Sequence, residues 1–113
     1  MAIPPAQLAK IESKLRAYCD DVPPHVRSQV RYGYSIVGNA IEFFTERTRF
    51  NAPKKWEREP IAKFRYVATR RQWELYCQHV DLEWHRYEML PYTARFDTLL
   101  AEVELDPTGI FWG

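Results

Sequence analysis

Hydrophobic and polar residues alternate with a period of two between Ile61 and Glu88, which is the period of side chains along a β-strand. Turns at Thr69–Gln72 and Gln78–Asp81 divide this segment into three strands. The apolar residues of all three strands then fall on one face, and a shift of one residue would exchange the faces. The pattern predicts three consecutive antiparallel strands with Trp73 and Trp84 buried.

The same two turns set the register of these strands. The first turn places Ala68 opposite Trp73 and Tyr66 opposite Leu75, and the second places Leu75 opposite Trp84. Because cross-strand pairs of large apolar side chains stabilise a sheet, both turns favour the same arrangement. The residues between these positions form the polar face.

A second hairpin is predicted from Val30 to Arg47. Its turn is Gly38-Asn39, a pair that readily adopts the positive φ of tight hairpin turns. The register places Phe44 opposite Gly33, where the ring can cover a weak strand position. The same register pairs the opposite charges of Arg31 and Glu46 across the polar face.

Both ends of the chain show the three-and-four spacing of amphipathic helices, in Ala6–Tyr18 and again in the segment that contains Phe96, Leu99 and Val103. With five strands between two helices, the chain is expected to be α+β. We predict a two-layer fold, in which a five-stranded antiparallel meander sheet carries both helices on one face. Residues 1–113 are expected to form a single domain.

The segment Thr48–Pro60 has no clear periodicity, contains two prolines and is rich in basic residues. We expect it to be a long loop. Trp56 lies beside Lys54, Lys55 and Arg58, and an aromatic ring among cations is a common grip on single-stranded nucleic acid. Charge runs are also common in solvated connectors, so both interpretations stay open.

Composition narrows the class of protein. Hydrophobic residues are 46% and charged residues 27% of the chain, as in an ordinary globular domain. The net charge of +1 is too small to attract the whole protein to nucleic acid or to an anionic membrane. Such binding therefore needs a local basic patch. Cys19 and Cys77 have no ligand spacing, so we expect no structural metal and no cofactor. No apolar run approaches about 18 residues, and Met1–Pro5 does not resemble a signal peptide. This predicts a cytoplasmic protein without a membrane partner.

Several motifs resemble a known family. They are, in order, VPPHVR, IEFFTERTRF, PIAKFRY, WELYCQHVDLEWHRYE and DPTGIFWG. In these motifs the chain resembles the uncharacterised bacterial domain-of-unknown-function family numbered 3024, over nearly its whole length. It departs at Cys77, where relatives are expected to carry tryptophan. The resemblance implies a single domain in a bacterial cytoplasm, and it implies no activity, substrate or catalytic residue.

Acidic residues of the polar face are candidate catalytic groups. If the two parts of the sheet are adjacent, they can bind a divalent metal for phosphodiester hydrolysis or act as acid and base. Basic residues on the same face can instead pair with them as ordinary ion pairs. The candidates are Glu42, Glu46, Glu74, Glu83 and His85.

The spacing of His79, Asp81, Glu83 and His85 also suits a transition-metal site on an extended strand. However, the predicted register places the first two residues in a turn. These side chains are equally explained as solvated residues, and no metal is expected.

Aromatic and basic residues also share the polar face. Such faces stack bases in several RNA-binding domains, build protein interfaces or simply cover a sheet. The expected function is a non-catalytic binding module for protein or nucleic acid, with a metal-dependent hydrolase or nuclease as the alternative, and a homodimer through a sheet edge is possible. The candidate binding residues are Arg31, Phe44, Lys54, Lys55, Trp56, Arg58, Lys63, Arg65, Tyr76 and Tyr87.

Overall fold

The computed structural model describes residues 3–21, 23, 25, 29–49 and 51–112, with the backbone alone described at positions 49, 52 and 53. Within these residues the elements follow the order helix, five strands, helix. The helices are α1 (Pro5–Asp20) and α2 (Phe96–Leu105). The strands are β1 (Val30–Val37), β2 (Ala40–Arg49), β3 (Ala52–Val67), β4 (Gln72–Gln78) and β5 (Trp84–Arg86).

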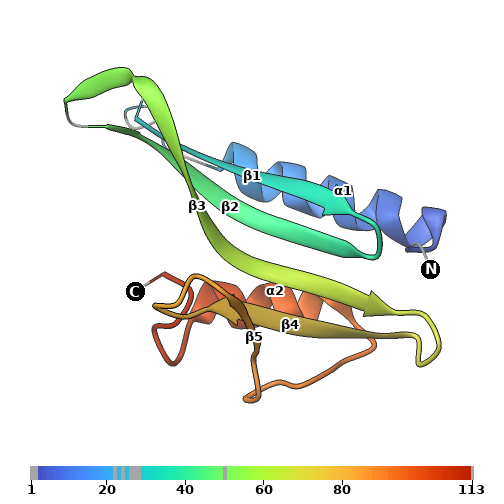
Figure 1. Ribbon diagram of the computed structural model, residues 1–113. Helices are drawn as coiled ribbons and strands as arrows, with labels where there is room; N and C mark the ends of the chain where they lie inside the picture. The colour runs from blue at the N-terminus through green and yellow to red at the C-terminus, as the bar shows by residue number, and fades with distance from the viewer. Residues whose placement is uncertain (1–2, 22, 24, 26–28, 50, 113) are drawn as a thin grey trace.

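The strands form one antiparallel sheet in the order β1-β2-β3-β4-β5. Both helices lie on the same side of the sheet, with α1 next to β1 and α2 next to β4 (Figure 1). The predicted two-layer α+β fold is therefore confirmed. The side that neither helix covers is called the open face. Its charged and aromatic side chains at paired strand positions are Arg31, Glu42, Phe44, Glu46, Trp56, Arg58, Lys63, Arg65, Glu74, Tyr76, Trp84 and Arg86.

The core lies between the sheet and the helices. Trp73 and Phe64 are fully buried, and their ring centroids lie 5.3 and 4.8 Å from that of Phe96 in α2. Leu15 of α1 is fully buried as well. The large aromatic residues of the central strands thus hold α2, because their alternation places every second side chain on the helix side.

The C-terminal segment docks onto this core. The carboxylate of Asp106 accepts hydrogen bonds from the backbone N–H groups of Phe111 and Trp112, at 3.0 and 2.9 Å. The indole of Trp112 donates to the carbonyl of Val103 at 2.9 Å, and its ring lies 6.0 Å from that of Phe43. This apolar segment therefore closes one end of the core.

The first hairpin has the predicted register. Phe44 lies opposite Gly33, and Arg31 lies opposite Glu46. Gly38 has a φ of 60° in the turn, as tight hairpin turns require.

The turn between β3 and β4 differs from the prediction by two residues. Tyr66, rather than Ala68, lies opposite Trp73. The turn closes on Arg71, whose φ of 52° lies in the left-handed region. Because a shift of two residues keeps each side chain on its face, Trp73 is buried as expected.

The predicted register of β5 is wrong by three residues. Trp84 lies opposite Gln78 and His85 opposite Cys77. An odd shift exchanges the two faces, so Trp84 is a half-buried residue of the open face and not part of the core. The longer turn closes on Leu82, which has a φ of 62°, and no glycine or proline marks it in the sequence.

The segment Thr48–Pro60 is a paired hairpin and not a loop. Thr48 lies opposite Trp56 and Glu46 opposite Arg58, so β2 and β3 continue as an arm beyond the body of the sheet (Figure 1, upper left). A register shift between Phe43 and Phe44 occurs next to Pro60, since proline is tolerated in strands at such irregularities. Phe50 lies outside the described residues.

Candidate binding surface on the open face

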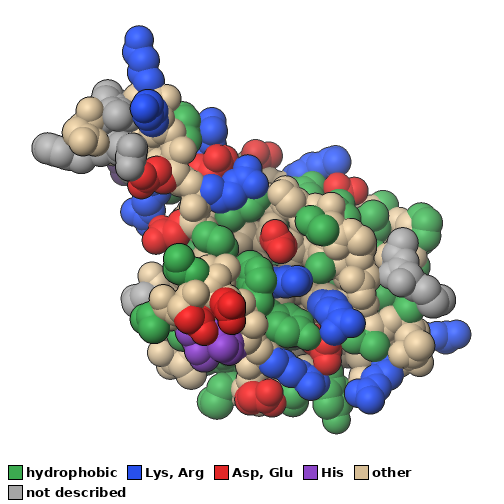
Figure 2. Space-filling view, in the orientation of Figure 1, with side chains coloured by type: hydrophobic (Ala, Val, Ile, Leu, Met, Phe, Trp, Pro, Cys, Tyr) green, Lys and Arg blue, Asp and Glu red, His purple; other side chains and the backbone are tan. Residues whose placement is uncertain are grey.

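Figure 2 views the open face. Basic side chains lie over the middle of the sheet and along the protruding arm, with acidic side chains between them and hydrophobic ones around them. Antiparallel pairing causes this mixture, because cross-strand neighbours share a face. The surface can be described in two halves, one on β1, β2 and the arm, and one on β3, β4 and β5.

In the first half, two arginines cover two aromatic rings. The guanidinium carbon of Arg31 lies 3.9 Å from the centroid of Trp56, and that of Arg58 lies 3.7 Å from the centroid of Phe44. Both arginines also pair with Glu46, at 3.2 and 3.9 Å. We call Arg31, Glu46 and Arg58 the Glu46 clamp. The register explains it, since the three residues are cross-strand neighbours on β1, β2 and β3.

Phe44, one of the predicted binding residues, is largely covered on this surface. It is only 7% exposed, because Gly33 lies beneath it and Arg58 above it. A Cβ atom at Gly33 would lie 2.6 Å from the Phe44 ring, so the close approach requires glycine. The flat surface that this position offers to solvent is therefore the guanidinium of Arg58.

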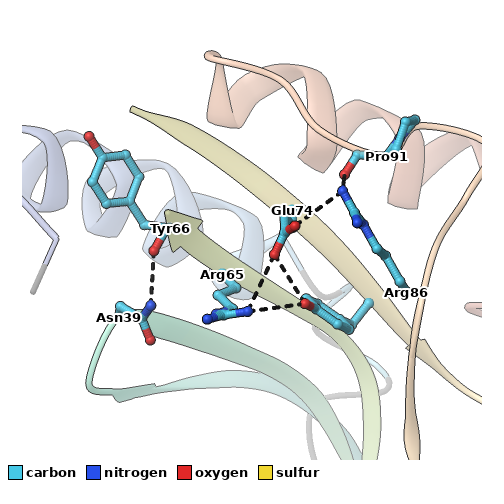
Figure 3. Close-up of polar contacts among 7 residues, drawn as sticks. Asn39, Arg65, Tyr66, Glu74, Arg86 and Pro91 are labelled. Carbon is cyan, nitrogen blue, oxygen red and sulfur yellow. Dashed lines mark hydrogen bonds and ion pairs between the residues drawn. The ribbon is translucent and has the colours of Figure 1, made fainter. Parts of the chain in front are cut away.

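In the second half, Glu74 takes the place that Glu46 has in the first. Its carboxylate lies 3.5 Å from Arg65 and 3.1 Å from Arg86 and accepts a hydrogen bond from the Tyr76 hydroxyl at 3.1 Å (Figure 3). We call Arg65, Glu74 and Arg86 the Glu74 clamp. The hydrogen bond of Arg65 with the Tyr76 hydroxyl raises the pKa of Arg65 above its ordinary value.

Lys63 lies between the two clamps along β3. Its Nζ atom is 5.8 Å from the ring centroid of Tyr76 and 6.0 Å from that of Trp84. Glu42 is its cross-strand neighbour, but in the described part of the chain neither residue forms an ion pair. Lys63 is thus a cation held beside two aromatic rings without a carboxylate partner among these residues.

Three further residues of the predicted binding set are Lys54, Lys55 and Tyr87. Lys54 and Lys55 are exposed on the arm. Tyr87, which we predicted on this surface, is buried on the helix side, where its ring lies 5.0 Å from that of Phe111. Its hydroxyl donates to Glu102 at 2.6 Å. Burial, together with Glu102, raises the pKa of Tyr87 to about 12. The cause is the register of β5, which also brings Trp84 and Arg86 to the open face in its place.

The candidate catalytic residues do not converge. Glu46 and Glu74 each form ion pairs with two arginines. Glu42 lies opposite Lys63, four residues along β2 from Glu46. Glu83 is exposed in the β4–β5 turn. His85 points to the other face. The described residues contain no group of three or more His, Cys, Asp or Glu side chains that could hold a metal ion.

The β4–β5 turn has its own small cluster. The ring of His85 stacks on that of His79 with centroids 4.0 Å apart, and its Nε2 atom lies 2.8 Å from Asp81. The backbone N–H of Glu83 and the His85 ring together lower the pKa of Asp81. These contacts close the turn locally, which explains the histidine–carboxylate spacing seen in the sequence.

The helix side has a groove that the sequence did not indicate. It has a volume of about 420 Å³ and lies between α1 and α2, with Tyr18 and Leu100 in its lining. An ion pair between Lys14 and Asp97 crosses it. No helix in the described part of the chain is long and apolar enough to cross a membrane.

Comparison with known proteins matches nearly the whole chain to one family. The family model described as Domain of unknown function (DUF3024) matches residues 3–113. The comparisons with curated proteins and with solved structures found no match.

Proposed function

The chain belongs to the family described as Domain of unknown function (DUF3024), and from the geometry of its open face we propose that it is a non-catalytic binding module for single-stranded nucleic acid in a bacterial cytoplasm. One observation carries the proposal. Basic and aromatic side chains from all five strands gather on the side of the sheet that neither helix covers. Such open sheet faces bind single strands by stacking and by charge.

The distribution of charge favours nucleic acid over protein as the partner. The segment 96–112 holds four acidic residues and no basic one, a net charge of −4. Since the whole chain carries +1, the remaining residues carry +5. The open face itself holds five basic and three acidic residues. The neutral total thus conceals a local basic surface, as phosphate binding requires.

The flat groups of the open face suit unstacked bases. Bases stack on aromatic rings and also on arginine planes, and this surface offers Tyr76, Trp84 and the guanidinium groups of Arg31 and Arg58. Protein interfaces also use tyrosine, tryptophan and arginine. The salt dependence of binding separates the two partners, because only a polyanion releases condensed counterions.

The test is fluorescence anisotropy with labelled single-stranded RNA and DNA of about 16 nucleotides, the upper end of the site size of one small module. We expect binding that weakens steeply as salt increases. The triple variant Lys54→Ala, Lys55→Ala, Arg58→Ala should lower the salt slope by up to about 0.7 for each lost phosphate contact. Tyr76→Ala should weaken binding by roughly 1–3 kcal/mol through lost base stacking. Trp56→Ala should weaken binding as well, because Arg31 loses the ring that fixes its guanidinium plane.

Two results would contradict the proposal. Absence of oligonucleotide binding at low salt rejects nucleic acid as the ligand. Oligonucleotide binding that is insensitive to salt and depends on Tyr76 but not on the lysines would contradict recognition of phosphates and would favour a protein as the partner. Metal-dependent hydrolysis was the other expectation, and no specific contact among Glu42, Glu46, Glu74, Glu83 and His85 favours it.

A further inference from the structure

Two glutamates on the open face are each held by two arginines from neighbouring strands. Arg31 and Arg58 hold Glu46, and Arg65 and Arg86 hold Glu74. The carboxylates lie deeper than the cations. The side chains of Glu46 and Glu74 are 20% and 12% exposed, whereas those of the four arginines are 36–55% exposed. In both clamps a carboxylate therefore lies below two guanidinium groups that reach into solvent.

We propose that the two clamps are phosphate-binding sites, and that Glu46 and Glu74 are resident anions whose place at the arginines is taken over by phosphates of the bound strand. This inference rests on the proposed function. A single negative charge between two guanidinium groups offsets their mutual repulsion in the free protein. A phosphate diester supplies the same charge, and arginine binds phosphate as readily as carboxylate with paired N–H donors.

Magnitudes favour such an exchange. Ion pairs between exposed side chains contribute little to stability, because water screens them and side-chain entropy opposes them. The arginines of both clamps are more than one third exposed, so water screens their side of each ion pair. Releasing the carboxylate costs less at Glu46, which is 20% exposed, than at Glu74, which is 12% exposed. Because the carboxylates lie deeper, the N–H groups on the solvent side of the arginines do not contact them. A phosphate can approach these N–H groups from solvent.

The aromatic rings of the arm have a positioning role in this arrangement. Trp56 and Phe44 each lie against one face of a guanidinium group, at 3.9 and 3.7 Å. Each ring fixes the plane of its arginine and leaves the other flat face to solvent, where a base can stack. The groups that touch the strand are then the guanidinium groups of Arg31 and Arg58, and the rings act through them.

The positions of the clamps indicate the path of the strand. Arg58 and Arg65 both belong to β3, and at about 3.3 Å per residue they lie about 23 Å apart along it. Lys63 lies between them without an ion pair in the described part of the chain. A nucleic-acid strand that runs along β3 would meet the Glu46 clamp, Lys63 and the Glu74 clamp in turn. This path is long enough for at least about 4 nucleotides.

The test compares two substitutions that each remove one negative charge from strand β2 of the protein. Glu46→Gln releases two arginines, whereas the control Glu42→Gln removes a carboxylate that forms no ion pair in the described part of the chain. In the anisotropy assay we expect Glu46→Gln to tighten oligonucleotide binding about fivefold and Glu42→Gln by less than about twofold. Glu74→Gln should resemble Glu46→Gln.

A double variant shows whether the gain passes through the clamp. Adding Arg58→Ala to Glu46→Gln should return the affinity to the wild-type level or below. Circular dichroism and thermal unfolding confirm that each variant is folded, and if Glu74→Gln unfolds, the Glu46 series alone decides.

The outcomes separate this inference from the proposed function. If the wild type binds and Glu46→Gln changes affinity no more than Glu42→Gln, the clamps are ordinary ion pairs and the inference is wrong, while the proposed function stands. If Arg58→Ala does not remove the gain, the inference is equally wrong. If the wild type binds no oligonucleotide, both are rejected.

Discussion

The two faces of the sheet use aromatic residues in opposite ways. On the helix side, rings pack on rings, as Trp73 and Phe64 do on Phe96. On the open face, rings are covered by cations, as Phe44 is by Arg58 at 3.7 Å. An aromatic face is electron-rich and attracts a guanidinium group as well as the edge of another ring. On the face without helices, arginine thus completes the packing and keeps part of its guanidinium group exposed to solvent.

The tryptophans divide between the same two regions. Trp73 is fully buried, and Trp112 docks on β1 and β2 from the helix side. Trp56 and Trp84 are half-buried on the open face beside Arg31 and Lys63. One residue type therefore stabilises the core on one side and supports a charged surface on the other, and substitutions can measure that difference.

The largest expected difference is between Trp73 and Trp56. Trp73→Ala removes a ring with no exposed surface and should lower the free energy of unfolding by about 3–5 kcal/mol. Trp56→Ala removes a ring whose main described partner is an exposed arginine and should lower it by less than about 1 kcal/mol. Urea unfolding followed by circular dichroism measures both. Equal losses would mean that the arm is part of the core.

A smaller effect is expected where Gly33 supports the open face. Gly33→Ala places a Cβ atom 2.6 Å from the Phe44 ring and should destabilise the fold by about 1–3 kcal/mol. In a Phe44→Ala background the same substitution should be nearly neutral, because the obstructing ring is gone. Ser35→Ala, on the same strand and face, is the matched control. A cost of Gly33→Ala that persists without Phe44 would refute the proposed contact.

The smallest effect concerns a tyrosine hydroxyl on each face. Tyr87→Phe removes the hydrogen bond to Glu102 and should cost about 1–2 kcal/mol at neutral pH. Tyr76→Phe removes a bond to Glu74 on a half-buried side chain and should cost less. The free energy of unfolding of each variant, measured against the wild type, tests the order.

The cost of Tyr87→Phe should depend on pH. The folded protein raises the pKa of Tyr87 from 10.0 to about 12. A raised pKa contributes stability that is complete below the unfolded value and is lost as pH rises through the folded value. Wild type and Tyr87→Phe should therefore converge in stability between pH 10 and 12. A difference that stays constant over that range would show that the hydroxyl is not held in its neutral form.

The parts of the fold with strong local signals were predicted correctly. The Gly38-Asn39 turn gave the register of β1 and β2 without error. The β3–β4 turn was misplaced by two residues. The face of each side chain was still predicted correctly, because side chains alternate along a strand with a period of two. The β4–β5 turn has no such signal, because Leu82 rather than glycine takes its left-handed position. That single error moved Trp84 and Tyr87 to the wrong faces.

The arm was missed for a different physical reason. A strand shows alternation when one of its faces is buried, and most side chains of the arm are exposed. Without a buried face, paired residues such as Thr48 and Trp56 leave no periodic pattern. The sequence accordingly predicted which residue types lie on the candidate surface, and it predicted the pair Arg31–Glu46. It did not predict the Glu74 clamp, because Arg86 reaches Glu74 only in the register of β5 that the structure shows.

The most direct measurement of the central claim uses the four indole N–H groups as reporters of the two faces. A single-stranded oligonucleotide is titrated into the ¹⁵N-labelled protein and followed in two-dimensional NMR spectra. We expect the indole resonances of Trp56 and Trp84 to move, while those of Trp73 and Trp112, held on the helix side, stay in place. Resonances of Trp56 and Trp84 that do not move, or movement of Trp112 alone, would contradict it.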